Sequence, residues 1–241
     1  MDARKLRDGG IGTYIRNLMS SLLATPEGHR YILFLLREDF GSIGRPGSPL
    51  EEVEVSAGKY TLAEHWHLAR AADRARVDLF HAPHYTLPLP LRCSAVVTVH
   101  DLIHIRFPRF FPAGASLYAR TVAGAAVRKA KLVLVDSSHV RDDVMELLGV
   151  PRDRIRVIPL GVSSALRRRN AAEVDRFRAG RGLPSGYLLY VGARKEHKNL
   201  SLLIDALGRI PAGSRPPLVI SGPEWAPSHR LARRALAASV S

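Results

Sequence analysis

The stretch Tyr187-Leu-Leu-Tyr-Val-Gly-Ala-Arg-Lys-Glu-His-Lys-Asn-Leu200 joins an apolar run to a cationic turn and then to a second apolar pattern. The first run ends at Gly192, and apolar residues recur at helical spacing over 200–207. This succession predicts a strand, a tight turn and a helix. In α/β sheets, anions bind where a strand end meets a helix N-terminus. Because Arg194 and Lys198 add fixed positive charge to the turn, the stretch predicts a site for a phosphate-bearing ligand.

Short apolar runs alternate with amphipathic stretches along the rest of the chain. Several runs, such as 31–36 and 132–135, are continuously apolar, which favours a parallel sheet covered on both faces. Between the runs, local signals mark helices: Ser137 or Ser138 is a candidate N-cap, and Gly149 a candidate stop. The alternation predicts a doubly wound α/β fold.

The polar, basic stretch 166–186 predicts a linker between two domains, 1–165 and 187–241. We expect the second domain to be incomplete, because two strands cannot bury a sheet with helices on both faces. The other end is also unusual. Gly9-Gly-Ile-Gly12 resembles the turn after a first strand, yet the residues before it are too polar for a buried strand. We therefore expect residues before Met1 to be missing.

The composition limits the classes of function. The chain has 241 residues, 46% of them hydrophobic, and a net charge of +14. Without an aromatic-rich basic motif or zinc-finger spacing, the charge does not predict specific nucleic-acid binding. A basic surface set by genomic composition is the simpler interpretation, and loose attraction to an anionic membrane is the alternative.

The compartment follows from equally simple features. The single cysteine, Cys93, cannot form an intrachain disulfide, and this fits a reducing compartment. Residues 1–25 do not resemble a signal peptide, and the apolar runs are too short to span a bilayer. We expect a cytoplasmic protein, with peripheral attachment at the inner face of the membrane left open.

Glycines and a histidine mark two candidate ligand sites. Gly9, Gly10 and Gly12 allow close backbone approach to an anion at a helix N-terminus. The full dinucleotide fingerprint is absent, which disfavours a nicotinamide-dependent dehydrogenase. His100 and Asp101 follow a buried strand, on the crevice side of an α/β sheet. Such a histidine can bind a hydroxyl or phosphate or move a proton, or it can be a buried histidine satisfied by backbone.

His81 and His84 lie at a similar strand end. Their spacing suits a metal ion, but no third ligand is evident nearby, so we expect no metal site. Lining of an acceptor groove is the better functional interpretation. Nucleophilic hydrolase chemistry and P-loop nucleotide binding are unsupported, because neither a GxSxG elbow nor a Gly-Lys-Ser/Thr motif occurs.

Seven segments in order resemble the retaining glycosyltransferases of family 4, which have the GT-B fold. They are Asp2-Ala-Arg4, Gly9-Gly-Ile-Gly-Thr-Tyr-Ile-Arg-Asn-Leu18, Asp78-Leu-Phe-His-Ala-Pro-His84, Val97-Thr-Val-His-Asp-Leu102, Val135-Asp-Ser-Ser138, Arg156-Val-Ile-Pro-Leu-Gly-Val162, and the interval from Tyr190 to Leu200. The branch is similar to bacterial mannosyl- and rhamnosyltransferases that build surface polysaccharides. The resemblance implies a Rossmann-like N-terminal domain that binds the acceptor and a second, here incomplete, Rossmann-like domain that binds the donor.

The resemblance also implies residue roles. His100 matches the histidine that contacts the transferred sugar, and we assign Asp101 to the same catalytic group. The donor phosphates would lie near Gly10, Gly12, Arg194 and Lys198. The acceptor groove would be lined by Tyr14, His81 and His84.

The implied reaction is transfer of a mannose-like hexose from a GDP- or UDP-linked donor to a glycan or lipid-linked acceptor, with retention. No metal ion or other cofactor is expected, because the fold does not need one. Fixed cations and backbone N–H groups would stabilise the departing nucleoside diphosphate.

The sequence departs from the family at two places. Glu196-His197 replaces the usual Pro-Arg before the phosphate-binding lysine, and the acidic motif of two glutamates eight apart is absent. We therefore expect residues 1–241 alone to show no measurable transferase activity. The alternative is a non-catalytic remnant, or a basic binding module for an acceptor lipid, a partner chain or a nucleotide.

Overall fold

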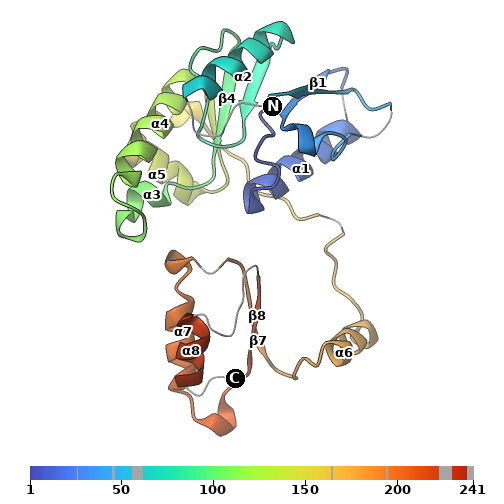
Figure 1. The fold of residues 1–241 in the computed structure, drawn as a ribbon, viewed down its shortest axis with the longest axis vertical. Coiled ribbons are helices and arrows are strands. Elements are labelled where there is room, and N and C mark those ends of the chain that lie inside the picture. The colour runs from blue at the N-terminus through green and yellow to red at the C-terminus, as the bar shows by residue number, and fades with distance from the viewer. Residues whose placement is uncertain are drawn as a thin grey trace. The chain divides into compact units, whose positions relative to one another are not determined.

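The structure of the protein is a computed structural model. It describes residues 1–25, 27–44, 47–55, 62–163, 165–193, 195–222 and 230–237. The chain forms two compact units, Met1–Ser163 and Ser164–Ser241 (Figure 1). The strands of each sheet pair in parallel, as the continuously apolar runs predict. No helix in these described ranges is long and apolar enough to cross a membrane.

The first unit contains a two-stranded and a four-stranded parallel sheet. In the smaller sheet β1 (Tyr31–Leu35) pairs with β2 (Leu50–Glu54). The larger sheet has the order β3-β4-β5-β6 and consists of β3 (Leu79–Ala82), β4 (Ser94–Val99), β5 (Leu132–Val135) and β6 (Ile155–Val157).

Residues 1–3 join the two sheets. The amide of Asp2 donates to the His81 carbonyl of β3 at 3.0 Å, and the amide of Phe34 in β1 donates to the Met1 carbonyl at 3.0 Å. The expectation that this polar segment cannot lie buried among strands is wrong. Arg4 donates two hydrogen bonds to the Asp2 carboxylate, at 2.9 and 2.7 Å, so the buried charges neutralise each other.

In the first unit, helices lie on both faces of the sheet that contains β1. They are α1 (Gly9–Ala24), α2 (Leu62–Arg74), α3 (Ile103–Arg106), α4 (Ala115–Lys129) and α5 (Ser138–Leu148). Leu33 and Leu35 of β1 pack with α1, whereas Ile32 and Phe34 belong to the core cluster that includes α2 and α4. This alternation is the period of two that a strand imposes on its side chains. Short 3₁₀ helices lie at Arg37–Asp39 (η1), Pro108–Phe110 (η2) and Arg152–Arg154 (η3).

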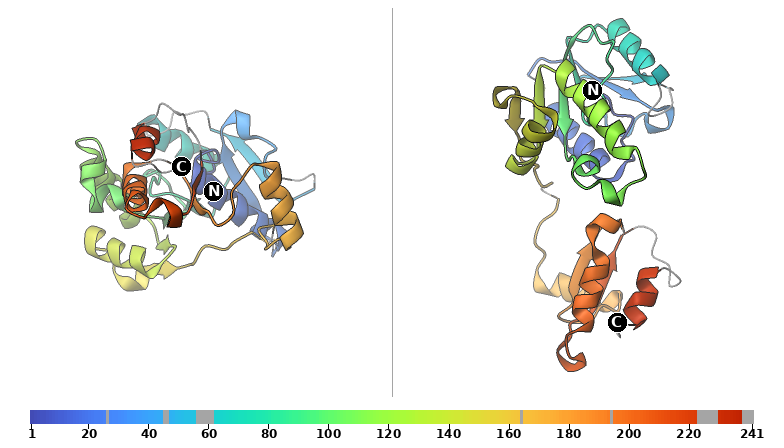
Figure 2. Two further views of the ribbon diagram at one scale, coloured as in Figure 1. Left: turned by 90° about the horizontal axis from the view of Figure 1, so that it is seen from below. Right: turned by 90° about the vertical axis from the view of Figure 1, so that its left-hand side faces the viewer.

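The second unit holds a two-stranded sheet with α7 and α8 packed on one side. It comprises α6 (Ala171–Gly180), β7 (Leu188–Val191), η4 (Glu196–Lys198), α7 (Leu200–Gly208), η5 (Ala212–Ser214), β8 (Leu218–Ser221) and α8 (Arg230–Ala237) (Figure 2). Leu200, Ile204 and Leu207 of α7 form its buried core, against which Tyr190 and Ile220 pack. Helix α6 lies in the stretch 166–186 that the sequence predicts as a linker, and this stretch belongs to the second unit.

The glycine-rich segment differs from the predicted turn. Helix α1 begins at Gly9, so Gly10 and Gly12 lie inside its first turns. Gly12 packs so closely on the preceding turn that a Cβ there would lie 1.9 Å from the Leu6 carbonyl oxygen. A Cβ at Gly10 would meet nothing within 4 Å. Of Gly10 and Gly12, therefore, only Gly12 occupies a position where packing excludes a larger side chain.

These two glycines give a matched pair for a stability test. Gly12→Ala should destabilise the protein by about 2 kcal/mol, because the backbone of Leu6 must move to accept the new methyl group. Gly10→Ala should be neutral or stabilising by up to about 1 kcal/mol, because alanine favours a helix at an unobstructed position. Urea unfolding followed by circular dichroism measures both changes. Equal effects would contradict the packing argument.

Candidate functional site

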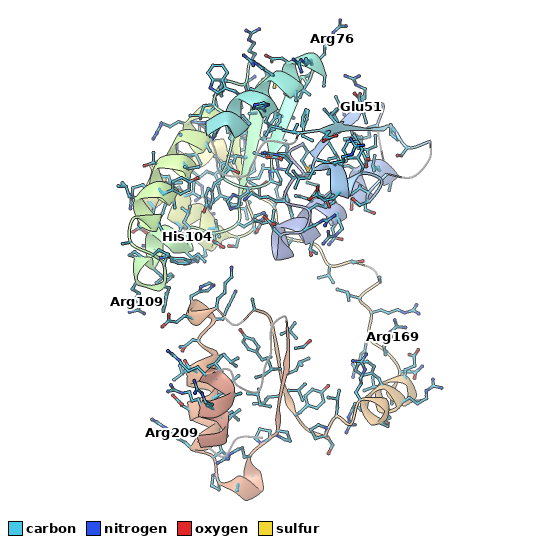
Figure 3. All side chains as sticks on the ribbon, viewed as in Figure 1. Glu51, Arg76, His104, Arg109, Arg169 and Arg209 are labelled. Carbon is cyan, nitrogen blue, oxygen red and sulfur yellow. The ribbon has the colours of Figure 1, made fainter. Side chains whose placement is uncertain are left out.

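Polar side chains gather at the carboxyl ends of neighbouring parallel strands in the first unit. Lys5 follows the joining segment 1–3, His84 follows β3, His100 follows β4 and Asp136 follows β5. Parallel strands direct their carboxyl ends to one edge of the sheet, where α/β folds bind ligands. Figure 3 shows the side chains of this unit, with His104 of α3 labelled.

Tyr14, Thr98 and His81 link α1, β4 and β3 through one oxygen atom. The Tyr14 hydroxyl lies 3.3 Å from Thr98 Oγ1, and His81 Nε2 lies 2.8 Å from the same atom. The Tyr14 ring also stands edge-on to the rings of His81 and His100, with centroid distances of 6.3 and 4.8 Å. The sequence predicted an acceptor groove from Tyr14 and His81, and the structure brings these two together with His100.

The buried position of this cluster shifts two pKa values. Burial raises the pKa of Tyr14, and the nearby Asp136 carboxylate adds to that effect. Burial lowers the pKa of His81 to about 3, assisted by the positive charges of the amino terminus and of His100. Tyr14 and His81 are therefore both uncharged near neutral pH, which suits contact with hydroxyl groups.

His100 is fixed at both ring nitrogens. Its Nδ1 lies 2.7 Å from Asp136 Oδ2, and its Nε2 lies 3.0 Å from the Pro83 carbonyl oxygen. A carboxylate and a carbonyl can only accept, so a ring that carries both protons satisfies both contacts. The sequence reasoning did not assign Asp136 a role. The signal was its place directly after the buried strand β5.

Asp101 has a different environment from that of His100. Its side chain is exposed, and its Oδ1 accepts a hydrogen bond from the Ile103 amide at 3.3 Å, at the start of α3. The carboxylate that contacts His100 is that of Asp136.

Gly10 lies on the side of α1 that faces the cluster. Residues four apart in a helix share a face, so Gly10 is one turn before Tyr14 on the same surface. The absence of a Cβ leaves open space there. Backbone N–H groups of the first helical turn and the positive end of the helix dipole favour an anion at this end of α1.

The cationic turn of the second unit forms as the sequence predicts, between β7 and α7. Lys198 ends η4 with its side chain exposed, and Asn199 takes a left-handed conformation, φ +51°, immediately before α7. Arg194 lies outside the described residues. At the strand ends, Gly192 and Gly222 touch through their backbones, because a Cβ on Gly222 would lie 2.1 Å from the Gly192 carbonyl oxygen.

The predicted site residues thus divide between the units. Tyr14, His81 and His100 come together in the first, to which Gly10 also belongs, whereas Lys198 belongs to the second. Among the described residues, no group of three or more His, Cys, Asp and Glu side chains is placed to hold a metal ion.

The chain matches the model for Glycosyltransferase Family 4 over residues 8–166, which is more than half of its length. It belongs to this family. Over 150 residues it is 30% identical to O-antigen chain mannosyltransferase B of Escherichia coli, a match that covers 60% of this chain and 38% of that protein.

Two solved structures show the same fold. HepE of Anabaena, in complex with UDP and glucose, superposes with a TM-score of 0.68 at 18% identity, over 96% of this chain and 63% of that one. Sucrose-phosphate synthase of Thermosynechococcus elongatus gives 0.65 at 19% identity, over 94% and 60%. These likenesses confirm the α/β fold of the GT-B type. The chain spans less than two thirds of the length of the proteins it matches.

The two lowered histidine pKa values predict a loss of stability in mild acid. Burial is the main cause of a pKa of about 3 for both His81 and His84. Unfolding returns each to about 6.5, so the unfolded state binds more protons below that pH. The stabilisation is complete above pH 6.5 and is lost as the pH falls towards 3.

Urea unfolding between pH 7.5 and 5 tests this. The unfolding equilibrium constant should rise as the pH falls below about 6.5, by up to about tenfold per pH unit for each histidine. His81→Gln should flatten this slope, because glutamine can bond Thr98 without titrating. Replacing the exposed His139 by glutamine is the control and should leave the slope unchanged. A pH-independent unfolding free energy over this range would contradict the assignment.

Proposed function

We propose that this Family 4 chain takes part in sugar transfer from a nucleoside diphosphate sugar to a glycan or lipid-linked acceptor. The observation that carries the proposal is the His100–Asp136 pair, fixed at the carboxyl end of β4 beside Tyr14 and open space at Gly10. Residues 1–165 serve as the acceptor domain, and residues 187–241 contribute to donor binding.

The donor is UDP- or GDP-linked, and no metal ion or other cofactor takes part. HepE, which shares the fold, was solved with UDP and glucose. Similarity to the E. coli mannosyltransferase favours a mannose-like hexose. Transfer proceeds with retention of anomeric configuration, as in the family branch that the motifs resemble.

Each unit contributes a distinct role. In the first, His100 offers its Nε2–H to a sugar hydroxyl in place of the Pro83 carbonyl, while Asp136 holds the ring through Nδ1. The donor phosphates lie at the first turn of α1, near Gly10 and Gly12. There the Gly10 N–H donates to a phosphate oxygen, whereas the Gly12 N–H already donates to the Asp8 carbonyl at 3.0 Å. In the second, Lys198 neutralises charge that develops on the departing diphosphate.

The acceptor lies along Tyr14, His81 and His84, and the uncharged side chains of Tyr14 and His81 suit a sugar. The protein acts in the cytoplasm, at the inner face of the membrane when the acceptor is lipid-linked. The exposed side chains of Arg167, Arg168 and Arg169 support this location, because clustered arginines attract anionic lipid.

Calorimetric titration of the purified full chain with GDP-mannose and UDP-glucose tests donor binding. Lys198→Ala should weaken binding of the preferred donor by about tenfold or more, because a charge-assisted contact to phosphate is lost. Arg209→Ala is the matched control: it removes one exposed positive charge just beyond the other end of α7.

Failure of both donors to bind would overturn the proposal, as would equal losses from the two variants. Donor binding without transfer to any lipid-linked or glycan acceptor would favour the alternative of a non-catalytic binding module.

A further inference from the structure

A group of cationic and titratable side chains surrounds His84 at the switch point of the first unit. Segment 1–3 lies between β1 and β3. From it the chain passes to β1 and β2 on one side and then returns to β3 on the other side, so the order of the strands reverses at this segment. Such a point is the usual ligand crevice of an α/β sheet. Lys5 follows that segment, His84 follows β3, His100 follows β4, and His104 lies in α3.

We propose that His84, with Lys5 and His104, binds a phosphate group, in the form of a phosphate or diphosphate ester of the substrate. The identification of that ester as a substrate rests on the proposed transferase function. The anion site itself rests on the side chains around His84.

Two buried nitrogen atoms lack partners at this place. Nδ1 of His84 and Nδ1 of His104 are inaccessible to solvent and have no hydrogen-bond partner within the described part of the chain. Each ring is held by an aromatic neighbour, His84 against Tyr85 at 3.9 Å and His104 against Phe111 at 4.0 Å between centroids. Because an unpartnered buried polar atom is costly, a ligand oxygen that accepts from these nitrogens would stabilise the cluster.

The charges that act on His84 have one sign. After burial, the positive charges of Lys5, His100 and His104 lower its pKa to about 3. The carboxylates of Asp2 and Asp136 are already engaged, Asp2 by Arg4 and Asp136 by His100. A bound phosphate would supply negative charge at His84, raise its pKa and allow Nδ1–H to donate. A metal cation is disfavoured, because the charge of Lys5 would repel it.

Inorganic pyrophosphate is a direct probe of this site. Titration calorimetry of the full chain at pH 6 and pH 8, in buffers of different ionisation enthalpy, should show proton uptake on binding and tighter binding at pH 6. His84→Gln should weaken binding at pH 6 by tenfold or more and abolish the proton uptake. His67→Gln, an exposed histidine of α2, should change neither.

A second measurement does not depend on a variant that folds. In the wild-type chain, the imidazole NMR signal of His84 should titrate at a higher pH with pyrophosphate present than without it. Absence of pyrophosphate binding, or binding that leaves the His84 titration unchanged, would overturn the proposal.

Competition identifies the source of the phosphate. Displacement of pyrophosphate by geranyl diphosphate, unaffected by Lys198→Ala, would assign the site to a lipid diphosphate acceptor. Displacement by UDP that requires Lys198 would assign it to the donor. Pyrophosphate binding through His84 without any nucleotide-sugar binding would contradict the transferase proposal and support the anion site. Nucleotide-sugar binding without a pyrophosphate response at His84 would overturn the anion site and leave the transferase proposal standing.

Discussion

The first unit depends on the insertion of residues 1–3 between β1 and β3. This segment joins the edge strand β1 of one sheet to the edge strand β3 of the other. The backbone hydrogen bonds are Phe34 to Met1, Ala3 to Phe34 and Asp2 to His81. This requires burial of Asp2 and Arg4, which are 5% and 2% exposed, and their bidentate ion pair makes that burial tolerable. Loss of either partner would leave a charge among apolar strands.

The joined sheet decides where the polar side chains meet. With segment 1–3 in place, Lys5 reaches the same edge as the ends of β3, β4 and β5. Thr98, 1% exposed, then connects Tyr14 with His81, while Asp136 and the Pro83 carbonyl fix His100 from two directions. The uncharged pair of Tyr14 and His81 lies beside the hydrogen-bonded pair of His100 and Asp136. This arrangement places uncharged hydrogen-bonding groups next to a ring that Asp136 orients.

Local rules recovered the elements that depend on neighbouring residues. The strand, turn and helix over 187–208 form as predicted, and α5 begins with Ser137 accepting from the Val140 amide and ends at left-handed Gly149. Helix α1 begins earlier than the predicted turn allows, because Gly9 and Gly10 are helical. Packing against Leu6, which spacing alone does not reveal, explains Gly12. Asp136 was missed because its partner His100 lies 36 residues away.

The sequence by itself determined the α/β class, the family and the candidate residues His100, His81 and Lys198, since periodicity, caps and ordered motifs are local properties. The tertiary structure alone decided that residues 1–3, with the charged Asp2, lie at the sheet centre. It also decided that Asp136 contacts His100 and that Lys5 and His104 lie close enough to His84 to lower its pKa. These outcomes depend on contacts between strands far apart in the chain, and on burial, which turns an ordinary histidine into one that titrates near pH 3.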